Sequence, residues 1–260
     1  EVLMSQTIIR VSFFLVALLL LALAAGFIGG IPAVTQLWPW PDGRLSYLFV
    51  ASILAAFGVG SLLISWTQDW RSAAGGGVAL MFGFGGMAAT LVSLRMDGTP
   101  IPTGYLVGYA LVALQGAALW YWGITNHRID PRPAPRLVRL STWVFAITLL
   151  LVGIALTLKA PTIFPWPLSA NSSMLYGWMF LGLSLNYGYV GLCNRWSDAK
   201  VSLMGFLAYD LVLILPFLQH FSHVRPEHLT SLSIYTAVLV YSGVLAVYYL
   251  FFARYWRLVP

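Results

Sequence analysis

The chain has 260 residues, of which 60% are hydrophobic and only 8% are charged. A soluble domain is about 25% charged, so this composition argues against a soluble enzyme, a nucleic-acid-binding protein and a disordered tail. The net charge of +6 is scattered among long apolar runs and forms no basic stripe. The single cysteine, Cys193, excludes an internal disulfide. Lipid is the solvent that suits such a chain, which predicts a polytopic membrane protein.

Eight stretches are long and apolar enough to be membrane spans. A span needs about 20 mostly apolar residues, and an open strand would leave backbone groups unpaired in hydrocarbon. The predicted spans are 8–30, 45–66, 75–95, 102–125, 138–159, 171–193, 200–219 and 230–253. The first is retained as a span because no clear signal-peptide cleavage site follows it. The predicted fold is therefore an all-α bundle of eight transmembrane helices.

The distribution of Lys and Arg predicts the orientation of the chain. If the amino terminus lies inside, ten basic residues fall on the cytoplasmic side, namely Arg10, Arg71, Arg128, Arg132, Arg136, Arg139, Arg195, Lys200, Arg254 and Arg257. Four fall outside: Arg44, Arg95, Lys159 and Arg225. The positive-inside rule then places both termini in the cytoplasm. The membrane is expected to be a bacterial cytoplasmic membrane.

An internal duplication relates the two halves of the chain at an offset of 126 residues. Trp-Pro-Trp-Pro at 38–41 matches Phe-Pro-Trp-Pro at 164–167, and further pairs hold the same register: Arg10 and Arg136, Ser46 and Ser172, Trp70 and Trp196, Pro100 and Pro226, Tyr109 and Tyr235, and Arg128 and Arg254. Four spans per repeat predict parallel halves. We expect a first four-helix repeat at 1–126, a cytoplasmic Pro/Arg linker at 127–137 and a second repeat at 138–260.

Tryptophans near the predicted span ends are expected to be interfacial anchors. The repeated Pro-Trp-Pro lies in an outer loop, and indole rings favour the headgroup level of a membrane. The expected anchors are Trp38, Trp40, Trp166, Trp70 and Trp196. In this repeated loop, followed by a span and an inner Trp beside a charge, the chain resembles uncharacterised bacterial multi-span membrane proteins with a duplicated Pro-Trp-Pro loop. No activity is attached to those proteins, so the resemblance implies no functional residues.

Asp210 is the strongest candidate for a functional residue. It lies midway along the seventh predicted span, where a charged carboxylate costs about 2.5–3.5 kcal/mol on insertion scales. Its duplicate position is Phe84. One interpretation is a cation or proton site formed by Asp210 with Asn186, Gln115, Tyr209 and Tyr241. The other is a protonated Asp210 that hydrogen-bonds to a neighbouring helix and stabilises the bundle.

Two further features of the spans favour structural interpretations. Pro216 interrupts the Asp210 span and predicts a kink, and the glycines at 75–77 and 83–86 predict a close helix–helix contact. Aromatic residues crowd the fourth and eighth spans, which fits either a pocket for a lipid, quinone or pigment or an interfacial belt.

The histidines give no support for a cofactor. His127, His220, His223 and His228 all lie near span ends, so no facing pair is available for haem. We expect no metal, no cofactor and no catalytic set, and hence a protein that is not an enzyme. The favoured function is a non-catalytic subunit or scaffold of a larger membrane assembly, with lipids and other membrane subunits as partners. The alternatives are a small carrier or channel that uses Asp210, and a binder of a lipophilic ligand.

Overall fold

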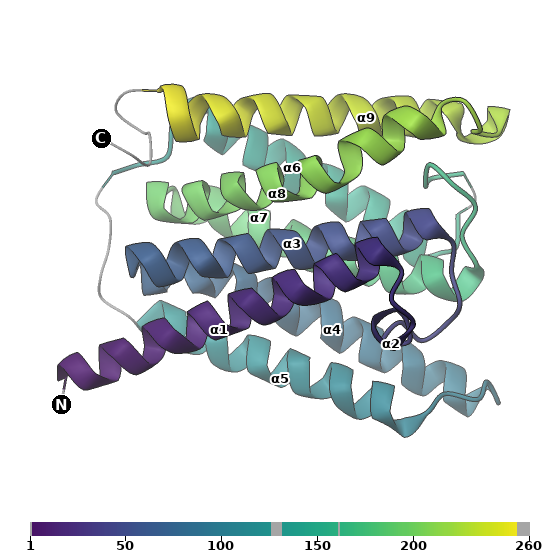
Figure 1. Cartoon of the computed structure of the whole chain (residues 1–260), viewed down its shortest axis with the longest axis horizontal. Coiled ribbons are helices and arrows are strands. Elements are labelled where there is room, and N and C mark those ends of the chain that lie inside the picture. The colour runs from purple at the N-terminus through teal and green to yellow at the C-terminus, as the bar shows by residue number, and fades with distance from the viewer. Residues whose placement is uncertain (1, 126–131, 161, 254–260) are drawn as a thin grey trace. The chain divides into compact units, whose positions relative to one another are not determined.

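The computed structural model describes residues 2–125, 132–160 and 162–253, with side chains from residue 6 onward, and the described residues are almost entirely helical (Figure 1). The long helices are α1 (Val2–Gly29), α3 (Arg44–Thr67), α4 (Ala73–Met96), α5 (Thr103–Thr125), α6 (Arg136–Thr157), α7 (Ala170–Cys193), α8 (Trp196–His220) and α9 (Pro226–Val247). Short elements that the sequence analysis did not foresee are α2 (Pro32–Thr35), the 3-10 turn η1 (Trp70–Ser72) and the π-helical turn η2 (Tyr248–Phe252).

Seven helices are long and apolar enough to cross a membrane, which confirms a multi-pass helical membrane protein. They coincide with seven of the eight predicted stretches. The remaining stretch, 171–193, falls on α7, which is not among the seven. Its polar residues lower its hydropathy, and several of them are buried against other helices rather than exposed to lipid. Ser173 Oγ donates to Leu156 O at 2.8 Å, and Ser184 Oγ donates to Ala146 O at 2.7 Å.

The chain divides into two compact units. Unit 1 comprises the described residues up to Asp69 and from Ala199 onward, and so contains α1, α3, most of α8 and α9. Unit 2 runs from Trp70 to Asp198 and contains α4, α5, α6 and α7. Each unit therefore draws two long helices from each half of the chain.

Glycines allow the helices of unit 2 to approach closely. Gly77 on α4 faces Gly116 on α5, and Gly153 on α6 faces Gly177 on α7. A Cβ built on Gly182 of α7 would lie 3.0 Å from Gly83 Cα on α4. Small residues at such crossings let backbones pack without a side chain between them. The predicted close contact at the α4 glycines is therefore confirmed.

The described part of the predicted linker is attached to the connection between α7 and α8. Trp196 N donates to Arg132 O at 2.9 Å, and Ala134 N donates to Asn194 O at 3.3 Å, so the two segments form a short antiparallel bridge. Residues 126–131 of the linker lie outside the described residues, as do Arg128, Arg254 and Arg257 of the orientation argument.

Candidate functional site: a polar seam between α8 and α9

The carboxyl group of Asp210 is held between two helices of unit 1. Asp210 lies on α8 and is 5% exposed, and its partner is the hydroxyl of Ser242 on α9, which is 2% exposed. Ser242 Oγ lies 2.9 Å from Asp210 Oδ2 and 3.1 Å from Oδ1. Among the residues that the structure describes, no cationic side chain forms an ion pair with Asp210. The carboxyl group is therefore buried beside a neutral hydroxyl.

The Ser242 hydroxyl can connect Asp210 to the backbone in either protonation state of the acid. Ser242 Oγ also lies 2.8 Å from Val238 O, the carbonyl one turn earlier on α9. A hydroxyl has one proton to donate and two lone pairs to accept with. When Asp210 is protonated, its O–H can donate to Ser242, which donates to Val238 O. When Asp210 is ionised, Ser242 can turn its proton to the carboxylate. This pair of groups can thus hold or release a proton with little rearrangement.

A pair of tyrosines extends the polar contact on the same two helices. Tyr209 precedes Asp210 on α8, and its hydroxyl hydrogen-bonds the hydroxyl of Tyr235 on α9. The ring of Phe217 lies 5.2 Å from the Tyr235 ring, and the ring of Phe49 on α3 lies 6.2 Å from that of Tyr209. Aromatic neighbours hold the phenol rings in place and leave the hydroxyls to pair with each other.

Polar residues repeat along α9 every seven positions. His228, Tyr235 and Ser242 lie on nearly one face of the helix, because seven residues are close to two turns. His228 and Ser242 are buried. They span about 21 Å along the helix axis at 1.5 Å per residue, which is most of the roughly 30 Å hydrocarbon thickness. Thr236, beside Tyr235, is also buried, and its hydroxyl has no hydrogen-bond partner within the part of the chain that the structure describes.

The polar seam is defined here as Tyr209 and Asp210 of α8 with His228, Tyr235, Thr236 and Ser242 of α9. The sequence predicts Tyr209 and Asp210 as site residues but not His228, Tyr235, Thr236 or Ser242. The seven-residue spacing on α9 is the signal that could have indicated the Tyr235 and Ser242 positions.

The remaining predicted site residues are Tyr241, Asn186 and Gln115. Tyr241 is next to Ser242 on α9 but its side chain is 46% exposed. Asn186 on α7 and Gln115 on α5 belong to unit 2. Asn186 is half-buried and lies against Gly75 of α4, whereas Gln115 is exposed.

Four of the five predicted interfacial tryptophans are buried within the protein. Trp38, Trp70, Trp166 and Trp196 are between 1% and 5% exposed, and Trp40 is half-buried. The ring of Trp70 lies 6.2 Å from that of Trp122, and Trp166 packs edge-on against Phe164 at 4.5 Å. The indole rings of Trp70 and Trp166 therefore pack against other aromatic side chains near the helix ends.

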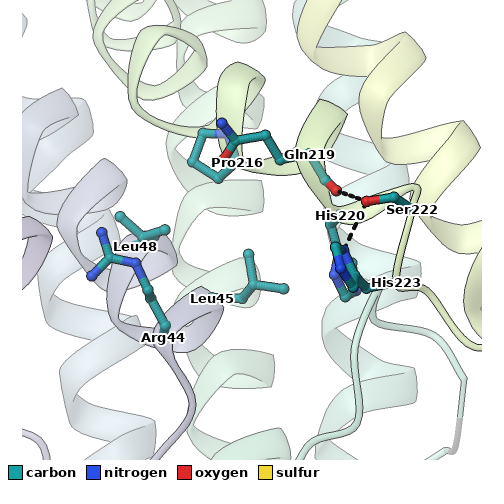
Figure 2. A pocket seen from close by; sticks show the side chains of 8 residues that line it. All are labelled: Arg44, Leu45, Leu48, Pro216, Gln219, His220, Ser222 and His223. Atoms are coloured by element: carbon teal, nitrogen blue, oxygen red, sulfur yellow. Dashed lines mark hydrogen bonds between the residues drawn. The ribbon is translucent and has the colours of Figure 1, made fainter.

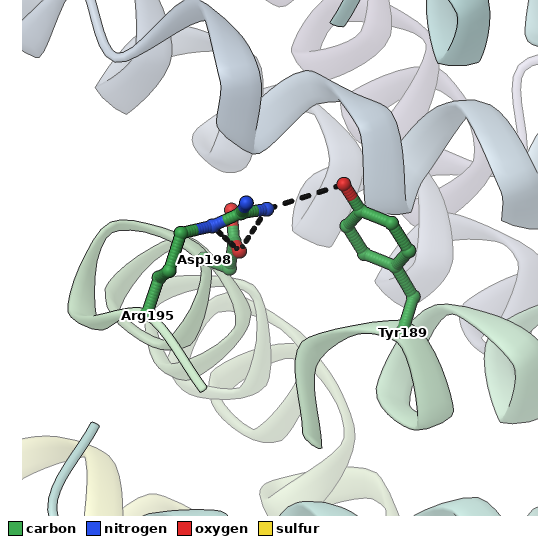
Figure 3. A network of polar contacts seen from close by, with 3 residues as sticks. All are labelled: Tyr189, Arg195 and Asp198. Carbon is green, nitrogen blue, oxygen red and sulfur yellow. Dashed lines mark hydrogen bonds and ion pairs between the residues drawn. The ribbon is translucent and has the colours of Figure 1, made fainter. Parts of the chain in front are cut away.

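A charged cluster lies at the junction of α7 and α8 in unit 2 (Figure 3). Arg195 donates to Asp198 Oδ2 through Nε at 2.7 Å, and its Nη2 donates to the hydroxyl of Tyr189 at 3.1 Å. Burial alone would lower the pKa of Arg195, but the Asp198 carboxylate and the Tyr189 hydroxyl raise that pKa above its ordinary value. The guanidinium therefore stays charged and ties the start of α8 to the end of α7.

A second ion pair lies in unit 1, where Lys200 of α8 donates to Asp69, which follows α3. Lys200 is 6% exposed. The two ion pairs give the first turns of α8 a polar environment beyond the apolar part of the span. Among the described residues, no group of three or more His, Cys, Asp or Glu side chains could hold a metal ion.

Comparison with known proteins finds no matching family model, no matching curated protein and no matching solved structure. Function is therefore inferred from the chemistry of the seam itself.

Proposed function

We propose that the protein is a small proton carrier or channel of the bacterial cytoplasmic membrane, with Asp210 as the residue that binds the proton. The observation that carries this proposal is the burial of the Asp210 carboxyl group beside the Ser242 hydroxyl, midway along a membrane span. Ionisable residues inside spans are costly and frequently mark proton relays. This is the second of the three functions considered from the sequence.

The seam around Asp210 suits a proton better than a metal cation. A hard cation needs several oxygen ligands at once, whereas Asp210 is bonded to one hydroxyl group. A proton needs only one basic oxygen and neighbouring groups that both donate and accept. Hydroxyls of Tyr209, Tyr235 and Ser242 have that property, and the buried His228 continues the seam toward the start of α9.

The proposal includes eight spans in two parallel repeats, with both termini in the cytoplasm. In support, α3 and α7 have 24 residues each, and their first residues and last residues both lie 126 positions apart. The residues that cap them, Gln68 and Asn194, are also 126 apart, and both are left-handed, with φ of 57° and 49°. A duplicated helix would be expected to keep both its length and a C-cap residue in the left-handed conformation.

Packing contacts in the two units also correspond at the same offset. Gly60 contacts Val201 in unit 1, and the residues 126 positions away, Asn186 and Gly75, contact each other in unit 2. Ala56 and Gly205 in unit 1 correspond in the same way to Gly182 and Ala79 in unit 2. Each half of the duplicated chain would then supply its first two spans to one unit and its last two to the other.

The proton function is tested by reconstituting the purified full chain in liposomes that contain a pH-sensitive dye. A potassium diffusion potential drives protons inward, and the rate of acidification is measured. We expect flux above that of protein-free liposomes, at least a tenfold loss in Asp210→Asn, and a partial loss in Ser242→Ala. Asp97→Asn is the matched control, because Asp97 is an exposed carboxylate after α4.

Equal flux in wild type and Asp210→Asn would overturn the assignment of Asp210, and an inactive wild-type protein would overturn the proton function. An inactive chain that copurifies with a stoichiometric membrane partner would instead support the subunit function that the sequence favours.

A further inference from the structure

A pocket of about 560 Å³ opens at one end of unit 1, between the start of α3 and the end of α8 (Figure 2). Its lining comprises Arg44, Leu45, Leu48, Pro216, Gln219, His220, Ser222 and His223. The volume is within the range of small-molecule sites. Arg44 is the first residue of one span and His220 the last residue of another. The pocket therefore lies where the apolar spans meet the loops, at the level expected for lipid headgroups.

One side of the pocket has a permanent positive character. Arg44 is exposed, and its guanidinium is charged at any physiological pH. It also begins α3, a helix of 24 residues whose N-cap, Gly43, has no side chain to satisfy the first N–H groups. Helix N-termini favour anions through their free N–H groups and dipole. Arginine adds two parallel donors that match phosphate or carboxylate oxygens.

The opposite side of the pocket contains an oriented imidazole. Ser222 Oγ lies 2.8 Å from Gln219 O and 2.7 Å from His223 Nδ1, and it can donate its proton to either acceptor. Which atom donates between Ser222 and His223 depends on the tautomer of the ring. In the tautomer that carries its proton on Nε2, His223 can donate that proton to a ligand. His220 adds a second imidazole to the same lining.

Asp42 is the acidic residue nearest to the start of α3 in the sequence, and it is not among the residues that line the pocket. Asp42 Oδ1 accepts the Gly43 N–H at 2.9 Å, and the Asp42 N–H donates to the Tyr47 hydroxyl at 3.1 Å. The other carboxylate oxygen, Oδ2, is buried and has no hydrogen-bond partner among the described residues. The lining itself contains no acidic side chain.

We infer that this pocket binds a phosphate group, with Arg44 and the start of α3 on one side and His220 and His223 on the other. Leu45, Leu48 and Pro216 supply an apolar wall that suits the carbon part of a phosphate ester. Two sources share this chemistry, a free phosphate or the headgroup of an anionic lipid. The site does not depend on the proton function, because none of its lining residues belongs to the polar seam.

The test measures binding to the purified full chain in dodecyl maltoside by phosphorus NMR line broadening. The two probes are inorganic phosphate and dihexanoyl phosphatidylglycerol. We expect Arg44→Gln to raise the Kd of the bound probe at least tenfold. Leu45→Trp, which keeps every charge but occupies the pocket, should raise it as well. Arg95→Gln is the matched control, because Arg95 is an exposed arginine that bonds Thr103 in unit 2.

The result for each probe identifies the source of the phosphate. Binding of inorganic phosphate that is lost in Arg44→Gln supports a free anion, and binding of the lipid alone with the same loss supports a headgroup. Binding that is equal in wild type, Arg44→Gln and Leu45→Trp would overturn the site, as would no binding of either probe. Because the assay involves no transport, its failure is distinguishable from a failure of the proton function.

Discussion

Gly77 on α4 and Gly116 on α5 face each other so closely that a Cβ built on either one would lie 2.8 Å from the carbonyl oxygen of the other. A Cβ on Gly116 would also lie 2.5 Å from Met81 N. Both neighbours are backbone atoms of a helix, which cannot move as the end of a side chain can. The spacing of α4 and α5 therefore depends on having no side chain at either position.

Gly116→Ala should destabilise unit 2 because the new methyl group must separate α4 from α5. Overpacking of this kind costs about 1–3 kcal/mol. Gly108→Ala, in the same helix, is a matched control: nothing lies within 4 Å of its Cβ position, and alanine favours helix. In thermal unfolding in detergent, we expect Gly116→Ala to have a clearly lower melting temperature than wild type, whereas Gly108→Ala should not. Equal melting temperatures would show that the helices are not in close contact.

The side of the membrane on which each terminus lies depends on α7. If α7 crosses, the chain has eight spans and both termini lie on the same side of the membrane, which we propose is the cytoplasm; if it does not, the termini lie on opposite sides. We expect it to cross, because its serine hydroxyls are bonded to carbonyls of α6 and need no water. Reporters that are active only in the cytoplasm should therefore be active at either end of the chain. Reporter activity at only one end of the chain would mean that α7 does not cross the membrane and that the chain has seven spans.

Asp210 and Ser242 should show measurable coupling in stability. Hydrogen bonds between membrane helices contribute about 0.6 kcal/mol on average and up to about 1.7 kcal/mol. In a double-mutant cycle with Asp210→Leu and Ser242→Ala, we expect a coupling free energy in this range. Pairing Asp210→Leu with Ser233→Ala is the control, because Ser233 is an exposed serine of α9 bonded to its own helix. A coupling of zero for Ser242 would contradict the contact.

The contact between Arg195 and Tyr189 should contribute equally to stability at pH 7 and at pH 9. Because the pKa of Arg195 is raised in the folded protein, its contribution is present below the ordinary arginine pKa and is lost only as pH rises through the raised value. Tyr189→Phe removes one hydrogen bond to a charged group, and such a bond contributes about 1.5–3 kcal/mol to stability. We expect the substitution to lower the free energy of unfolding by the same amount at pH 7 and at pH 9. If Tyr189→Phe lowered the free energy of unfolding at pH 7 but not at pH 9, Arg195 would not be the charged donor.

The long helices could be located from the sequence because hydropathy is a local property. The predicted span 45–66 and helix α3 at Arg44–Thr67 differ by one residue at each end, and 171–193 differs from α7 by one residue. Asp210 could also be recognised, since a lone acid in an apolar run is costly wherever the helix packs. The four-residue α2 and the π-helical turn after α9 could not, because neither produces a hydropathy pattern.

The partners of these helices were decided only by the tertiary structure. Lipid tails are as apolar as leucine, so hydropathy does not determine which helix packs against which. The choice depends on close contacts such as Gly77 with Gly116, and on hydrogen bonds such as Asp210 with Ser242, whose partners are distant in sequence. For the same reason the sequence did not indicate Ser242, which the structure places beside Asp210. Composition and charge determine that this chain is a membrane protein, and complementary helix surfaces determine the seam in which Asp210 lies.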